Sequence, residues 1–252
     1  MARFAASLTY LFTELPMHQR FAAARRAGFE GAEILFPYDL PVKDLRNHAK
    51  EAGLEFVLMN TPPPNWAGGV RGFAADPHNI ARFRSDFDRA LRFAQALNVR
   101  HIHIMAGKAE GDEARRTMVE NLKWAVTRAP KASLVIEPIN DRDVPGYFLN
   151  CFDLAANILT EVGAPNLGLQ FDSYHAHMIE GDVIATWLKH GQHVRHIQIA
   201  GCPGRHEPRG GEIDFARFFS EVRETGYIGW IGAEYTPDTT TEEGLRWLRN
   251  GG

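Results

Sequence analysis

Cysteine is scarce in this sequence of 252 residues, which contains only Cys151 and Cys202. Their spacing matches no metal-binding or redox motif, so we expect both thiols to be reduced, as suits a cytosolic protein. No apolar run approaches the roughly 18 residues that a membrane span needs, and the N-terminal segment lacks the apolar stretch of a signal peptide. We therefore expect a cytoplasmic protein with no membrane partner.

An excess of positive charge is also missing. Lys and Arg number 28 against 31 Asp and Glu, which gives a formal net charge of −3. A protein that binds nucleic acid by general attraction to phosphate needs a basic surface, so we expect no nucleic-acid partner. The Walker A pattern, the glycine-rich dinucleotide pattern after a strand and the Gly-x-Ser-x-Gly elbow are absent too. Chemistry on nucleoside triphosphates or dinucleotides therefore has no support.

What the sequence does contain is a regular alternation of strand-like and helix-like segments. Helices are expected at 17–27, 42–52 and 80–97, near 115–128, and at 152–162, 183–189, 215–222 and 242–248. Strands are expected at 4–8, 32–36, 54–59, 101–105, 134–137, 167–172, 196–199 and 230–234. Gly28 and Gly53 follow two of the helices as candidate C-caps.

Eight strand–helix units in strict alternation predict an α/β protein with a parallel sheet covered by helices. The length fits one (β/α)₈ TIM barrel, and no linker, low-complexity tract or repeat divides the chain. We therefore expect residues 1–252 to form a single TIM-barrel domain. A doubly wound open sheet is the alternative.

Polar residues end four successive strand-like runs in the second half of the chain. Glu137, Asp172, Gln198 and Glu234 are 35, 26 and 36 residues apart, about the length of a strand, a loop and a helix. The carboxyl ends of barrel strands meet at one mouth, where three carboxylates would repel one another without a cation. Oxygen donors suit Mg²⁺ or Mn²⁺. The pattern predicts a divalent metal site.

Each of these residues also has a simpler interpretation. Glu137 and Glu234 would be surface carboxylates, although each follows an apolar run that favours burial. Asp172 would only cap a following turn. Gln198, between two isoleucines, would only hydrogen-bond inside the barrel.

Histidines near these strand ends are candidates for substrate binding. We assign His175, three residues after Asp172, to the substrate or to support of the site, and His177 to the surface or to packing. His101 and His103 share one face of their strand, where an ordinary polar layer and a substrate contact are equally compatible with the pattern.

Two loops near the expected mouth complete the candidates. Arg205 follows the strand 196–199, where its guanidinium is suited to pair with a substrate carboxylate, although a surface arginine is the simpler interpretation. The segment with Trp66 and several glycines is, by its position alone, a candidate lid over the mouth.

Several motifs together resemble the hydroxypyruvate isomerase family, which belongs to the xylose-isomerase-like TIM barrels. They are IEPIN (136–140), QFDSYH (170–175), HIQIA (196–200), RHEP (205–208) with GEI (211–213), and GWIGAEY (229–235). The similarity runs over essentially the whole chain. RHEP and the segment HIMAG (103–107) are more similar to the 2-oxo-tetronate isomerase branch.

The resemblance implies an isomerase that acts on a short hydroxy-oxo acid through an enediolate. The substrate would be 2-oxo-tetronate or hydroxypyruvate, and a divalent Mg²⁺ or Mn²⁺ ion would assist. The implied metal ligands are Glu137, Asp172, Gln198 and Glu234, with Glu137 and Glu234 also the acid–base pair. The residues assigned to the substrate are His103, His175, Arg205 and Glu207.

Three other functions stay open at this point. A ketose 3-epimerase would use the same barrel, metal and paired glutamates. A phosphodiesterase of the endonuclease IV type would need more histidines at the strand ends and a basic groove. A catalytically silent binder of sugar acids is the third. Substrate length, the metal used and assembly into a homo-oligomer also stay open.

Overall fold

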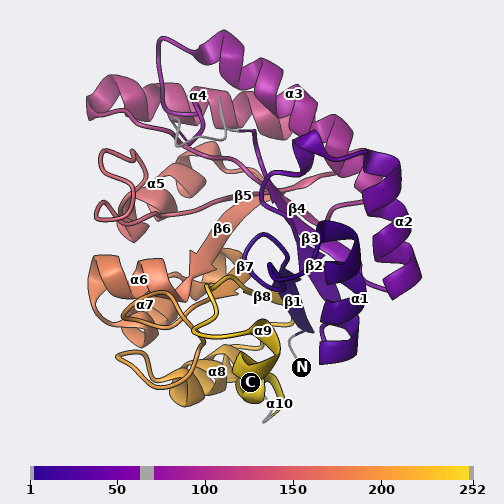
Figure 1. Ribbon diagram of the computed structural model, residues 1–252. Coiled ribbons are helices and arrows are strands. Elements are labelled where there is room, and N and C mark those ends of the chain that lie inside the picture. The colour runs from indigo at the N-terminus through magenta and orange to yellow at the C-terminus, as the bar shows by residue number, and fades with distance from the viewer. Residues whose placement is uncertain (1–2, 63–70, 250–252) are drawn as a thin grey trace.

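The computed structural model describes residues 3–62 and 71–249 and contains a closed barrel of eight parallel strands, paired in sequence order. The strands are β1 (Arg3–Ser7), β2 (Gly31–Glu33), β3 (Glu55–Asn60), β4 (His101–His103), β5 (Ser133–Ile136), β6 (Leu167–Asp172), β7 (Val194–Ile199) and β8 (Trp230–Ala233). Figure 1 shows the helices arranged around this ring of strands.

The outer layer is helical. Its members are α1 (Met17–Ala27), α2 (Val42–Ala52), α3 (Ile80–Leu97), α4 (Gly111–Arg128), α5 (Phe152–Val162), α6 (Ser173–Glu180), α7 (Val183–His190), α8 (Phe215–Glu224), α9 (Thr241–Gly244) and α10 (Arg246–Arg249). Two single 3₁₀ turns, η1 (Pro37–Asp39) and η2 (Gly191–His193), complete the described elements. No helix in the described ranges has the combined length and apolar character that a bilayer crossing requires.

Pairing between the first and last strands closes the barrel. Ala5 of β1 lies opposite Gly232 of β8, and Ala5 also lies opposite Gly31 of β2. An open doubly wound sheet would leave two free edges, so that alternative is wrong. All strands run the same way, so their carboxyl ends surround one mouth.

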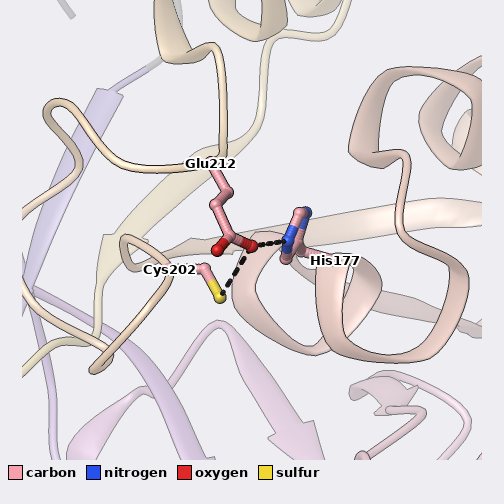
Figure 2. A group of neighbouring side chains, drawn as sticks. All are labelled: His177, Cys202 and Glu212. Atoms are coloured by element: carbon pink, nitrogen blue, oxygen red, sulfur yellow. Dashed lines mark hydrogen bonds and ion pairs between the residues drawn. The ribbon is translucent and has the colours of Figure 1, made fainter.

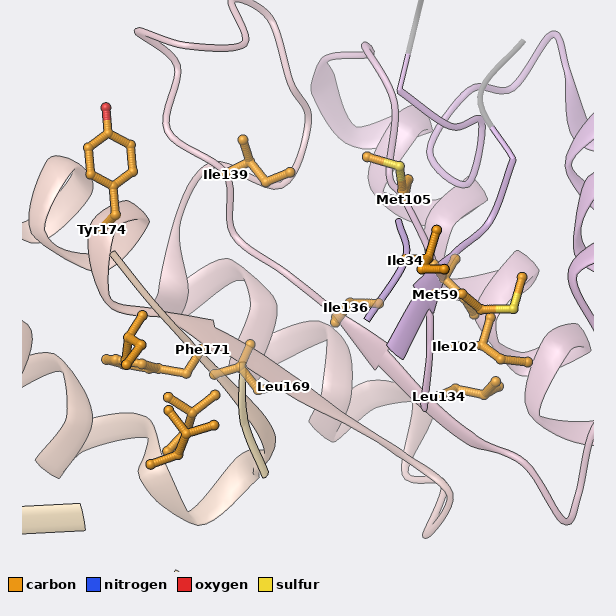
Figure 3. Close-up of a cluster of buried hydrophobic side chains, with 14 of the residues drawn as sticks. Ile34, Met59, Ile102, Met105, Leu134, Ile136, Ile139, Leu169, Phe171 and Tyr174 are labelled. Carbon is orange, nitrogen blue, oxygen red and sulfur yellow. The ribbon is translucent and has the colours of Figure 1, made fainter. Parts of the chain in front are cut away.

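The apolar core lies mainly between the strands and the helices. Successive side chains of a strand point to opposite faces. The apolar side chains that face the helices form one large cluster. Figure 3 shows part of it, including Ile102 of β4, Leu134 of β5 and Phe171 of β6. Among the described residues, Ala5, Val57 and Trp230 form a separate small cluster.

Most predicted helix boundaries are confirmed. The bounds of α1, α2, α3 and α5 agree with the periodicity, and Gly28 and Gly53 end α1 and α2 in the left-handed conformation that favours glycine. One helix was not predicted, because α6 begins at Ser173 directly after β6 with no intervening loop. The Trp66 segment, proposed as a lid, lies outside the described residues.

Candidate active site at the mouth of the barrel

Three carboxylates meet at the mouth. Glu137 directly follows β5, Asp172 is the last residue of β6, and Glu234 directly follows β8. All three are buried, with exposed fractions of 5%, 0% and 5% respectively. The closed barrel therefore brings together three carboxylates that are far apart in the sequence.

Arg205 lies between two of these carboxylates. One guanidinium nitrogen is 3.0 Å from Oδ2 of Asp172 and 2.9 Å from Oε1 of Glu234. The residue has a left-handed backbone with φ of 56°, a conformation that costs on the order of 1–3 kcal/mol outside glycine. Its carbonyl accepts a hydrogen bond from the amide of Thr236 at 2.9 Å, which helps to hold this conformation.

Burial dominates the electrostatics of the cluster. It raises the pKa of Glu234 to about 8 against the opposing charge of Arg205, and it raises the pKa of Asp172. Burial, followed by the charges of Asp172 and Glu234, holds the pKa of Glu137 well above its usual range. Burial alone would lower the pKa of Arg205, but Glu234 and Asp172 raise it overall. Arg205 and, to a smaller extent, Arg71 therefore oppose the charge of these buried carboxylates.

Gln198 is also buried and forms part of a chain of side-chain contacts inside the barrel. Its Oε1 accepts a hydrogen bond from Nε2 of Gln170 at 2.6 Å, and its own Nε2 donates to Oε2 of Glu33 at 2.8 Å. Nε2 of His196 is 2.7 Å from Oε1 of Glu33. A side chain at Gly232 would collide with the Glu33 carboxylate, so glycine provides the space for this contact.

Glu33 and Gln170 were missed by the sequence reasoning. Glu33 has the same signal as Glu137, because it is an acidic residue inside the apolar run from Ala32 to Leu35. Gln170 lies two residues before Asp172 on β6, so both side chains point to the same face of the strand. Both would have been found by asking which polar residues of each strand face inward.

The two histidines at the mouth are held by asparagines. Nδ1 of His103 lies 3.2 Å from Oδ1 of Asn60 and 3.6 Å from Oε2 of Glu137. Nδ1 of His175 accepts from the amide side chain of Asn140 at 2.7 Å, so in the neutral ring its Nε2 carries the proton. Burial lowers the pKa of His103 to about 3 and that of His175 well below its usual range, so both rings are neutral.

Glu207, assigned to the substrate from the sequence, lies elsewhere. Its carboxylate accepts from the amide of Asp238 at 3.3 Å and lies against Gly244. It is absent from the lining of the cavity of about 70 Å³ that Glu137, His175, Arg205 and Glu234 share. His177 pairs with Glu212 at 2.8 Å, away from this cavity.

The donor set at the mouth fits a cation. Glu137 and Asp172 each offer a carboxylate oxygen, and a ring nitrogen of His175 lies within 4.8 Å of both. Because Nδ1 of His175 accepts a hydrogen bond from an asparagine and Nε2 carries a proton, the carboxylates rather than this ring are the candidate ligands. Three buried carboxylates exceed the charge of Arg205 and of Arg71, which also lines the cavity, and a bound cation would offset that excess. These residues could therefore hold a metal ion in an oxygen-rich setting.

Comparison with known proteins agrees with this geometry. Residues 21–251 match the protein family described as xylose isomerase-like TIM barrel. A 2-oxo-tetronate isomerase of Cupriavidus necator is 45% identical over 99% of this chain and 98% of its own length. The hydroxypyruvate isomerase of Escherichia coli is 39% identical over 98% of each chain. A crystal structure from Brucella melitensis, described as AP endonuclease, family 2, superposes with a TM-score of 0.96 at 40% identity, covering 100% of this chain and 99% of that one.

A closed parallel barrel with acidic residues gathered at its mouth thus defines the general class, the xylose isomerase-like TIM barrels. Identity of 45% and 39% over nearly complete chains narrows the class further. The chain belongs to the hydroxypyruvate isomerase and 2-oxo-tetronate isomerase family, and it is an isomerase.

Proposed function

We propose that the protein interconverts short hydroxy-oxo acids, either 2-oxo-tetronate with 3-oxo-tetronate or hydroxypyruvate with tartronate semialdehyde. The observation that carries this proposal is the pair of buried glutamates, Glu137 and Glu234, on one small cavity beside Arg205. The names of the two relatives support the substrate class.

The paired glutamates account for the proton movements. One carboxylate removes the proton from the carbon that bears the hydroxyl group, and the other delivers a proton to the neighbouring carbon. The hydroxyl proton passes to the former carbonyl oxygen, so atoms and charge balance. Positioned acid–base groups typically contribute about 10²–10⁴-fold in rate.

A divalent ion such as Mg²⁺ or Mn²⁺, when held by Glu137, Asp172, Gln198 and Glu234, would supply a Lewis acid for the two substrate oxygens. Asp172 and Glu234 must then share their charge between the ion and Arg205. Gln198 would bind through Oε1, the oxygen that also accepts a hydrogen bond from Gln170. His175 already presents an N–H group and is suited to donate to a substrate oxygen.

Arg205 is suited to hold the substrate carboxylate. Its Nε is buried and has no hydrogen-bond partner among the described residues. A buried guanidinium donor without a partner is costly, and a substrate carboxylate would satisfy it. A neutral sugar ketose has no such group, so this contact favours an acid isomerase over a ketose 3-epimerase.

Proton exchange in D₂O tests the proposal. The purified protein is incubated with Mg²⁺ or Mn²⁺ and, separately, with hydroxypyruvate, 2-oxo-tetronate or a ketohexose, and NMR follows deuterium incorporation and product. We expect one of the acids to exchange and isomerise faster than the ketohexose. Exchange of the ketohexose alone would establish the epimerase alternative. Cleavage of abasic-site DNA with no exchange would establish the phosphodiesterase.

A further inference from the structure

A second group of metal-binding side chains lies away from the mouth. It consists of His177 in the last turn of α6, and Cys202 and Glu212 in the loop between β7 and α8; we refer to it as the His-Cys-Glu cluster. Nε2 of His177 is 2.8 Å from Oε2 of Glu212, and Sγ of Cys202 is 4.0 Å from the same oxygen. Figure 2 shows the carboxylate of Glu212 between the thiol and the imidazole.

The fold holds these three donors in place without a metal. The amide of Glu212 donates to the carbonyl of Cys202 at 2.8 Å, which fixes the two ends of their loop against each other. Sγ of Cys202 also lies 3.8 Å from Sδ of Met178, the residue after His177. The cluster is accessible from one side, since the side chain of Glu212 is 60% exposed while Cys202 is buried.

The donor types select the metal. A thiolate, an imidazole and a carboxylate together suit Zn²⁺ and similar transition ions, whereas Mg²⁺ prefers oxygen alone. Tetrahedral Zn²⁺ with bonds of about 2.0–2.3 Å places its donors about 3.3–3.6 Å apart. All three donor atoms already lie within 4.8 Å of one another, so shifts on the order of 1 Å complete the site, with water as the fourth ligand.

We propose that His177, Cys202 and Glu212 form a binding site for a zinc-class transition ion, distinct from the metal site at the mouth. On binding, the thiol of Cys202 releases its proton to solvent, and His177 binds through Nε2. The loop that the ion ties to α6 carries Arg205, so occupancy restrains the segment from which Arg205 reaches the carboxylates. This inference does not depend on the reaction proposed above.

Cobalt substitution tests the site directly. Titration of the full-length protein with Co²⁺ is expected to produce a sulfur-to-cobalt charge-transfer band that saturates at one ion per chain and is removed by Zn²⁺. The mouth offers no thiol, so Co²⁺ bound there cannot produce this band. Cys202→Ser should abolish the band, and His177→Gln should weaken Co²⁺ binding at least tenfold.

Cys151→Ser is the matched control, because it removes the only other thiol and should leave the band unchanged. Tryptic cleavage at the exposed Arg209, inside the loop, gives a second readout. Zn²⁺ should slow this cleavage in the wild type but not in Cys202→Ser. No band at excess Co²⁺ with folded protein, or a band that survives in Cys202→Ser, would overturn the proposal. Equal protection of both proteins would refute the restraint on the loop.

Discussion

At the scale of single residues, the mouth of the barrel concentrates negative charge where burial disfavours it. Burial and the neighbouring carboxylates raise the pKa of Glu137, which means that ionised Glu137 destabilises the folded state. Glu137→Gln should therefore raise the melting temperature of the metal-free protein while it lowers kcat of the metal-loaded protein at least 10²-fold, because the amide cannot exchange the proton. Glu234→Gln should lose turnover in the same way. Thermal unfolding and steady-state kinetics measure both effects.

Asp86→Asn is a suitable control for these variants. Asp86 is a buried carboxylate on α3 that pairs with Arg82 at 2.9 Å and does not line the cavity at the mouth. Its replacement should leave kcat unchanged. Wild-type turnover in either glutamine variant would remove that glutamate from the reaction.

Arg205 provides a second prediction at this scale. Arg205→Ala should raise KM for the hydroxy-oxo acid about 10- to 100-fold, the range expected for loss of a hydrogen bond to a charged group. KM for a neutral ketose should change much less. Arg209→Ala, an exposed arginine in the same loop, should leave both values unchanged. Equal effects of Arg205→Ala on acid and ketose would show that the guanidinium organises the carboxylates rather than the substrate.

At the scale of elements, α6 links helix capping to the site. The side chain of Asp172 accepts from the amides of Tyr174 and His175, and Asp182 caps α7 in the same way through Ile184 and Ala185. Asp182→Ala should lower the free energy of unfolding by about 1 kcal/mol, as for other N-caps, with activity unchanged. Denaturant unfolding measures this cost.

Asp172→Asn separates the two roles of Asp172, because asparagine also caps helices well. We expect this variant to keep α6 through its cap, to lose the stability that the Asp172–Arg205 ion pair supplies, and to lose divalent-metal affinity and turnover. Full activity in Asp172→Asn would mean that the residue serves only as a cap, the simpler interpretation of its sequence context.

The same elements show which helices and which contacts of the site could be predicted from the sequence. Helices such as α3 were predictable because apolar residues repeat at helical spacing along one face and polar residues occupy the opposite face. Helix α6 was not, since it is short and follows β6 without a loop. The convergence of Glu137, Asp172 and Glu234 followed from acidic residues ending apolar strands. The contact of Arg205 with two of them depends on a loop conformation that residue types do not encode.

At the scale of the whole molecule, the barrel contains several buried polar side chains, among them His101, His103 and His196. Inward residues of β4 and β7 place the rings of His101 and His196 5.5 Å apart, and Nδ1 of His101 lies 2.9 Å from Oγ of Ser133. Burial, with a smaller contribution from His196, lowers the pKa of His101 to about 2. The folded barrel therefore excludes a proton that the unfolded chain accepts at a pKa of about 6.5.

Acid should consequently destabilise the fold through His101. A histidine with a lowered folded pKa contributes stability that is fully present above pH 6.5 and is lost as the pH falls towards 2. At pH 5.0, about 1.5 units below the unfolded value, the loss from His101 alone is about 2 kcal/mol.

His101→Asn keeps a polar group near Ser133 but cannot take up the proton. Between pH 7.5 and 5.0, urea unfolding should show the wild type losing about 2 kcal/mol more than this variant. His18→Asn, at an exposed position of α1, should lose as much as the wild type. Equal losses in wild type and His101→Asn would show that the ring is protonated inside the folded barrel.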